Sequence, residues 1–316
     1  MKLVAYICCL FVLLLTSCEK SGDSKRVERL QDDTTEIVVA VFPSLDALPL
    51  MIANDRGILD SLGLAVKFCV YRSQMDCEKS LAEGNADVAM TDLFRVGWWQ
   101  WQKKPVRFAF ATKRDMGLVA NKVLRISKVA QLDDRMIAAT RFSLEDYYCD
   151  KVVEQITKRK GQILRPQINS VELRAKMLVS GQLDAAVLAR LQVVKAGNAG
   201  YDALKIGRIS TDGFAGYAFN MGSWHDMAKQ KQMVKLQRAY DIVVKQLCAQ
   251  ATMPEISETT LKSLFLDKQT VVSIKPKNDF AKSGAPRDTN IVTVVERLKQ
   301  WSAVGEFFSA DTLCIK

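Results

Sequence analysis

The sequence is short of the residues from which metal centres and nucleophilic active sites are usually built. It contains a single histidine, His225, and no Cys-x-x-Cys pair among the five cysteines that follow Cys18. The ligand spacing typical of a zinc site is therefore missing. A lone histidine without a triad partner has no nucleophile to activate. We expect no metal, no cofactor and no covalent chemistry.

Patterns typical of nucleic-acid binding are also missing. The formal charge is +10, but no RNP-like, zinc-finger or basic-zipper pattern concentrates it. The excess suits either anionic partners or a solvated surface. With 316 residues, 48% of them hydrophobic and 25% charged, the chain is long enough for two globular lobes.

The N-terminus has the features of an export signal. Its apolar run, which ends at Leu15, is too short for a comfortable membrane span and predicts a signal peptide over residues 1–17. The sequence Leu-Thr-Ser-Cys that ends at Cys18 resembles the bacterial lipobox, which implies lipidation of this cysteine and anchoring of the exported chain to a membrane. A plain signal peptide or a chance cysteine is the alternative. Residues 18–35 are charged and lack aromatics, which predicts a flexible tether.

A strand, loop and helix pattern opens the remainder of the chain. Residues 36–42 form a β-branched apolar run typical of a buried parallel strand. A loop follows, and a helix is expected with Asp46 as its N-cap and Pro49 in its first turn. After a turn at Gly63 a second strand runs to residue 68.

The same pattern returns in the second part of the chain. A strand over 135–140, a helix over 146–158 capped by Ser143, and strands over 163–168 and 184–188 repeat the order of elements. A Leu-x-x-Gly-x-x-Asp sequence occurs in both parts, ending at Asp87 and at Asp184. Each part should form a small parallel sheet with helices on its faces.

Two cysteines, a group of tryptophans and the C-terminal helices lie outside this comparison of the two parts. Cys69 and Cys77 are spaced for a disulfide but suit buried thiols equally well. A helix over 92–104 carries tryptophans that suit core packing or a ligand cage. A long helix is expected over 223–250, with Ser223 as its cap and His225 in its first turn, followed by helices near 257–266 and 290–301.

Candidate binding residues follow the strands, because ligands of open parallel sheets bind at the carboxyl ends of the strands. In the first part these are Pro43, Ser44, Leu45, Asp46, Thr91, Asp92, Arg95 and Thr112, and in the second part Arg141, Phe142, Ser143 and Arg190. Arg141 and Arg190 could clamp an anion in bidentate fashion or could lie on the surface. Ser143 is as well placed to cap a helix as to contact a ligand.

Together these patterns resemble a known family. The strand and Pro43 loop, the Leu-x-x-Gly-x-x-Asp sequences and Gly181-Gln-Leu-Asp-Ala look like periplasmic substrate-binding proteins of the type II fold, in the branch that binds nitrate, sulfonates, taurine and thiamine pyrimidines for ABC importers. The resemblance implies an α/β fold with lobe 1 over 36–113, lobe 2 over 114–210 and completion of lobe 1 by 211–316. It also implies closure of the lobes on a small organic solute, either anionic or uncharged, and docking of a monomer on a membrane permease.

The sequence departs from this family at one informative place. After the strand that ends the second repeat, many members have Glu-Pro, whereas this chain has Ala189-Arg-Leu. The identity of the solute therefore does not transfer. Two alternatives remain: an enzyme on the same fold, with an acid or base among Asp46, Asp92 and Glu145, or a sensory or assembly lipoprotein. The related pyrimidine-synthesising enzymes use a cysteine-rich iron motif and histidines, which this chain lacks.

Overall fold

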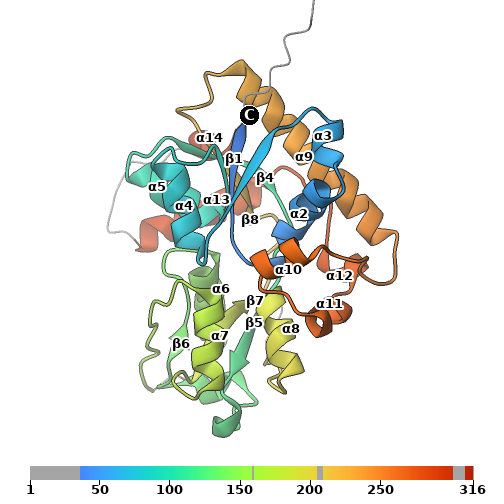
Figure 1. Cartoon of the computed structure of the whole chain (residues 1–316). Coiled ribbons are helices and arrows are strands. Elements are labelled where there is room, and N and C mark those ends of the chain that lie inside the picture. Colours follow the sequence, from blue (N-terminus) through green and yellow to red (C-terminus); the bar gives the residue numbers. More distant parts are fainter. Residues whose placement is uncertain (1–35, 159, 205–208, 302–309, 316) are drawn as a thin grey trace, which may run out of the picture. The chain divides into compact units, whose positions relative to one another are not determined.

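The computed structural model describes residues 36–158, 160–204, 209–301 and 310–315. These residues belong to one compact unit that contains two β-sheets, each flanked by helices (Figure 1). We call the larger sheet with its helices lobe 1 and the smaller one with its helices lobe 2. The predicted signal peptide, Cys18 and the tether lie outside the described residues. Within the described ranges, no helix is both long and apolar enough to cross a bilayer.

The sheet of lobe 1 has five strands in the order β2-β1-β3-β8-β4. The strands are β1 (Ile37–Val41), β2 (Val66–Val70), β3 (Val88–Asp92), β4 (Val106–Ala111) and β8 (Ala215–Asn220). β1 pairs in parallel with β2 and β3, but β8 runs antiparallel to both β3 and β4. The sheet is therefore mainly parallel, as expected, and β8 is its antiparallel strand because the chain inserts it after it returns from lobe 2.

Helices cover both faces of this sheet. They are η1 (Leu45–Ala47), α2 (Leu48–Asp55), α3 (Ile58–Ser61), α4 (Gln74–Ala82), α5 (Leu93–Trp101), α9 (Met227–Cys248), α10 (Glu258–Ser263), α11 (Lys268–Ser273), α12 (Pro276–Asp279), α13 (Asp288–Trp301) and α14 (Ala310–Leu313). α9 packs on α2, and α13 packs on α5. The C-terminal part therefore completes lobe 1.

The sheet of lobe 2 has three strands in the order β5-β7-β6. They are β5 (Met116–Ala120), β6 (Ile137–Ala138) and β7 (Ala185–Ala189), with η2 (Lys122–Leu124), η3 (Val129–Leu132), α6 (Leu144–Val153), α7 (Val171–Val179) and α8 (Arg190–Asn198) around them. β6 pairs in parallel with β7, whereas β5 is antiparallel to it. The strand predicted over 163–168 is wrong, because only single bridges at Leu164 and Gln167 form there.

The repeated Leu-x-x-Gly-x-x-Asp sequence has the same structural role in both lobes. Gly84 and Gly181 lie in the left-handed region, with φ of 80° and 79°, where a side chain is disfavoured. The carboxylate of Asp87 accepts a hydrogen bond from the backbone N–H of Val38 at 2.9 Å. The carboxylate of Asp184 accepts one from Met136 N–H, also at 2.9 Å. The repeat therefore ties each α-helix–strand turn to the neighbouring strand.

Two predicted helix starts are wrong. Asp46 lies inside η1, and the cap residue of α2 is Ala47, which provides no side-chain hydrogen bond. α9 begins at Met227 with Asp226 as its cap, so His225 precedes the helix. Ser143, in contrast, caps α6 as predicted and accepts a hydrogen bond from the N–H of Glu145 at 3.1 Å.

Candidate functional site

The loop after β1 forms one side of the candidate site. Pro43, Ser44, Leu45 and Asp46 are all buried. Asp46 accepts hydrogen bonds from Ser44 Oγ at 2.5 Å and from Thr112 Oγ1 at 3.0 Å. Its carboxylate also pairs with the guanidinium of Arg114, with Nη2 and Nε at 2.8 Å and 3.0 Å from Oδ2. Asp46 is therefore fixed by a buried ion pair rather than by a helix N-terminus.

A polar network extends from this ion pair across lobe 1. Arg114 Nη1 donates to Gln74 Oε1 at 3.3 Å, and Gln74 Nε2 donates to Asp92 at 2.6 Å and to Glu78 at 2.7 Å. Glu78 in turn pairs with Arg95 Nε at 2.7 Å and accepts from Thr91 Oγ1 at 2.8 Å. The network thus holds three carboxyl groups against two guanidinium groups, so one acid lacks a cationic partner of its own.

Asp92 is the carboxyl group of this network whose pKa is raised. It is 1% exposed, and burial, together with the charge of Glu78, raises its pKa from 3.8 to about 6. Hydrogen bonds from Gln74, from the N–H of Arg95 and from the N–H of Leu144 limit the rise in pKa. Because Leu144 is the first residue of α6, the Asp92 carboxyl group of lobe 1 lies at the N-terminus of a lobe 2 helix.

The loop after β6 forms the opposite side. Glu145 accepts a hydrogen bond from the N–H of Thr140 at 2.8 Å and pairs with the fully buried Arg174, with guanidinium nitrogens at 2.6 Å and 3.1 Å. Phe142 has a positive φ of 55°. Its N–H donates to Asp146 at 3.0 Å, which holds the loop in this disfavoured conformation.

The two lobes meet directly along this line. Gln192 Nε2 of α8 donates to the carbonyl oxygen of Pro43 at 3.1 Å. Leu144 and Leu191 of lobe 2 belong to the hydrophobic cluster of lobe 1. The Phe142 ring stacks on Trp98 of α5, with centroids 4.4 Å apart and planes 6° apart. The loops after the strands of both sheets are therefore in contact in this structure.

The two arginines predicted to clamp an anion each have a carboxylate partner. Arg141 Nη1 is 3.2 Å from Asp146 Oδ1, within lobe 2. Arg190 Nε is 2.8 Å from Asp279 Oδ1, which joins α8 of lobe 2 to α12 of lobe 1. Their side chains are 31% and 36% exposed. An anionic solute would have to replace these carboxylates, so the clamp stays a prediction.

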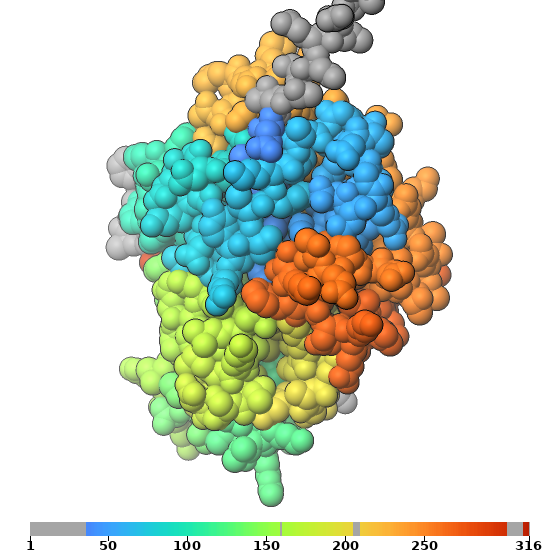
Figure 2. Space-filling model, in the orientation of Figure 1, coloured from blue at the N-terminus to red at the C-terminus, as the bar shows by residue number. Residues whose placement is uncertain are grey.

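Two pockets border the contact between the lobes. One, of about 320 Å³, is lined by Arg72 and Phe265 of lobe 1 and by the first turns of α7, including Ser170 and Glu172. Figure 2 shows this face, where the C-terminal helices in orange lie beside lobe 2 in yellow-green. Glu172 connects this pocket to the interior, because its Oε1 accepts a hydrogen bond from Gln192 Nε2 at 3.1 Å.

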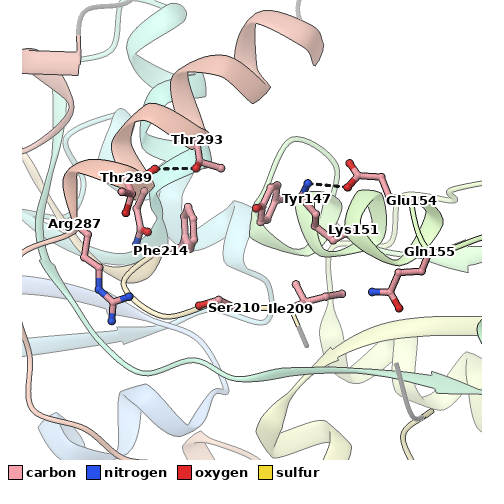
Figure 3. A pocket seen from close by; sticks show the side chains of 11 residues that line it. Tyr147, Lys151, Glu154, Gln155, Ile209, Ser210, Phe214, Arg287, Thr289 and Thr293 are labelled. Carbon is pink, nitrogen blue, oxygen red and sulfur yellow. Dashed lines mark hydrogen bonds and ion pairs between the residues drawn. The ribbon is translucent and has the colours of Figure 1, made fainter. Parts of the chain in front are cut away.

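The other pocket, of about 520 Å³, lies beside the chain crossing that leads into β8. Its walls come from α6, residues 209–214 and the start of α13. The rings of Tyr147 and Phe214 lie next to each other in its wall, with centroids 5.6 Å apart, and Lys151 forms an ion pair with Glu154 at its rim (Figure 3). None of the twelve predicted binding residues lines either pocket.

Some residues of the site were missed by sequence reasoning. Gln74, Glu78, Glu172, Arg174 and Gln192 lie on helices, where polar residues are expected to face solvent. Arg114 was not missed in this way: it lies two residues beyond Thr112, where the predicted strand ends, and is therefore one of the strand-end positions at which a binding site is expected. The question left open for the cysteines is answered by the structure, since all five described cysteines are free thiols. Burial raises the pKa of Cys149 to about 12.

Comparison with known proteins supports the fold. The chain is similar to the zinc-bound ligand-binding component of an ABC-type import system from Staphylococcus aureus, with 11% identity, a TM-score of 0.70, and coverage of 89% of this chain and 96% of that one. The aliphatic sulphonate-binding protein SsuA from Escherichia coli has 11% identity and a TM-score of 0.66, with coverage of 89% and 92%. The nitrate-binding protein NrtA from Synechocystis PCC 6803 has 14% identity and a TM-score of 0.64, with coverage of 88% and 84%.

These likenesses define the fold class. The chain has the two-lobed α/β fold of periplasmic substrate-binding proteins, as the sequence pattern predicts. No family model and no curated protein matches the sequence. In the parts of the chain that the structure describes, no group of three or more His, Cys, Asp or Glu side chains is placed to hold a metal ion.

Proposed function

We propose that this chain is an exported, lipid-anchored solute-binding protein that captures a small organic solute between its lobes and delivers it to an ABC permease. The observation that carries the proposal is the meeting of the two strand-end loops. Pro43 of lobe 1 accepts a hydrogen bond from Gln192 of lobe 2, and the Phe142 ring of lobe 2 stacks on Trp98 of lobe 1. In a fold shared with ligand-binding components of importers, this is where a solute would touch both lobes.

Binding and closure are coupled by differential affinity. A solute that contacts both lobes stabilises the closed arrangement by the contacts that the open arrangement cannot supply. The hydrogen bonds already formed between the lobes supply part of that stabilisation, so the solute adds to a preformed contact. The lipid on Cys18 would hold the protein near its permease.

The site favours binding over catalysis. Asp92 has the raised pKa that an enzyme on this fold would need in an acid or base. It is, however, 1% exposed, and the hydrogen bonds described for it come from the protein itself. A substrate would have to displace Gln74 or the start of α6 to reach it.

The proposal is tested by identifying the solute. Purified protein would be denatured, and the released small molecules identified by mass spectrometry. Adding an identified solute back to solute-free protein should raise the melting temperature and reduce the radius of gyration measured by small-angle X-ray scattering. Conversion of the bound molecule to a product would favour the enzyme instead. Solute binding without uptake by cells that carry the neighbouring permease would favour a sensory lipoprotein.

A further inference from the structure

Gln192 is the polar side chain that joins the two lobes most directly. It is the third residue of α8, its side chain is fully buried, and its Nε2 donates to Pro43 O and to Glu172 Oε1, both at 3.1 Å. Both partners are oxygen acceptors. The amide orientation is therefore fixed, because a flipped amide would place its oxygen against two other oxygens.

The oxygen of the same amide has no such partner. Gln192 Oε1 is enclosed and accepts no hydrogen bond from the residues that the structure describes. Buried polar atoms in folded proteins are nearly always hydrogen-bonded, and each exception calls for an explanation. In this arrangement of the lobes the acceptor is shielded from water, and no described donor takes the place of water.

The position of this acceptor differs from that of two other unpaired polar atoms. Tyr240 Oη lies in the hydrophobic core of lobe 1, and Arg174 Nε belongs to a guanidinium that already makes four hydrogen bonds inside lobe 2. Gln192 alone among these three bonds across the lobes. Its Nε2 also donates to Glu172, which lines the pocket of about 320 Å³ between Arg72, Phe265 and α7.

We infer that the solute carries an N–H or O–H donor at its inner end, which donates to Gln192 Oε1, and that acceptor-only oxyanions such as nitrate, sulfate or a simple sulfonate are not its ligands. The solute class is that of small amines, amides and amino acids or amino sulfonates. This inference rests on the proposed function, since it assumes a solute between the lobes. An anionic group at the outer end of such a solute remains compatible with it.

The test uses pairs of solutes of similar size in which one member carries an N–H donor that the other lacks. The members also differ in net charge, so the variant of Gln192 decides whether a preference comes from the donor contact. Ethanesulfonate and 2-aminoethanesulfonate, propionate and β-alanine, and acetate and acetamide would be titrated calorimetrically into the full-length protein freed of bound molecules. The donor member of at least one pair should bind about tenfold more tightly, the ratio expected for one hydrogen bond. Nitrate and sulfate should not bind.

A variant of Gln192 locates the donor contact. Gln192→Met keeps the length of the side chain and removes the acceptor, so the tenfold preference for the donor member should disappear. The same change at the exposed Gln182, Gln182→Met, should leave the preference unchanged. Because the comparison is a ratio between two solutes in one variant, a general loss of affinity through the lost bond to Pro43 does not affect it.

Each outcome decides between the two proposals. Equal or tighter binding of the acceptor-only members, or a preference that persists in Gln192→Met, would overturn the donor inference and leave solute binding intact. If no solute in the pairs and none released from the purified protein binds, both the inference and the proposed function fail.

Discussion

Replacing Asp92 by asparagine should change how stability depends on pH. The carboxyl group is buried and its pKa is raised from 3.8 to about 6. Between these two values the folded protein binds more protons than the unfolded chain does. The unfolding free energy of the wild type should therefore be highest at the acidic end of this window and fall as pH rises from about 4 to above 6.

The size of the effect follows from the two pKa values. At 1.36 kcal/mol for each pH unit, the rise from 3.8 to about 6 corresponds to about 3 kcal/mol. Asp92→Asn has no proton to bind and should remove a fall of about this size. The amide Nδ2 of the variant would face Gln74 Nε2, so one hydrogen bond is lost. That loss lowers stability equally at every pH and does not alter the slope.

The assay is urea unfolding of both proteins at half-unit steps between pH 4 and pH 7. Burial also raises the pKa values of Asp115 and Asp146, so the wild-type slope contains their contributions, and the difference between the two proteins isolates Asp92. Asp267→Asn serves as a control without a slope change, because hydrogen bonding from Thr270 N–H lowers the pKa of Asp267 from 3.8, so this carboxyl group is ionised in both the folded and the unfolded state over most of the pH window. Equal slopes in wild type and Asp92→Asn would show that the network holds Asp92 ionised throughout.

Three further predictions concern stability, binding and anchoring. Arg114→Met should lower the unfolding free energy by about 3–5 kcal/mol in urea titrations, because it leaves the buried Asp46 without its cation; a loss below about 1 kcal/mol would show that water replaces the guanidinium. Arg141→Ala and Arg190→Ala should each weaken the binding of an anionic solute in calorimetry while the melting temperature changes little, since both guanidinium groups are partly exposed and the buried carboxylates of Asp146 and Asp279 keep hydrogen bonds from Phe142 N–H and Lys275 N–H; wild-type affinity in both variants would refute the anion clamp. Cys18→Ser should release the chain into the soluble fraction and remove the mass of a lipid from the mature protein, and an unchanged membrane fraction would exclude lipidation at this residue.

Local sequence was sufficient to predict the repeated elements. The strand at residues 37–41 follows from a run of β-branched residues, and both Leu-x-x-Gly-x-x-Asp turns follow from a glycine that accepts a positive φ. Ser143 was recognised as a helix cap because its hydrogen-bond partner is two residues away. In each case the pattern and the interaction lie within a few residues of each other.

Strand pairing between segments far apart in the sequence was harder to predict. β8 has an apolar sequence that fits any buried strand, and nothing in it specifies antiparallel pairing with β3 and β4. That pairing is set by the path of the chain as it returns from lobe 2. Likewise, Ser223 and Asp226 are spaced as a capping box, but the helix begins only at Met227.

The chemistry of the site depended on contacts that sequence patterns do not carry. Asp46 was expected to cap a helix and is instead paired with Arg114, which is 68 positions further along the chain. Gln192 bonds to Pro43 across 149 positions. The approach of the two sheets decides which of the polar residues after each strand contact a neighbour and which face solvent.

By itself, therefore, the sequence determined most of the strands and helices of each repeat and both Leu-x-x-Gly-x-x-Asp turns, because these depend on short-range periodicity and turn residues. Only the tertiary structure decided that Asp92 is buried at the start of α6 with a raised pKa, that each proposed clamp arginine has a carboxylate partner, and that Gln192 Oε1 is enclosed without a donor. Burial and charge pairing arise from residues far apart in the chain, and their energies are fixed only when the lobes meet.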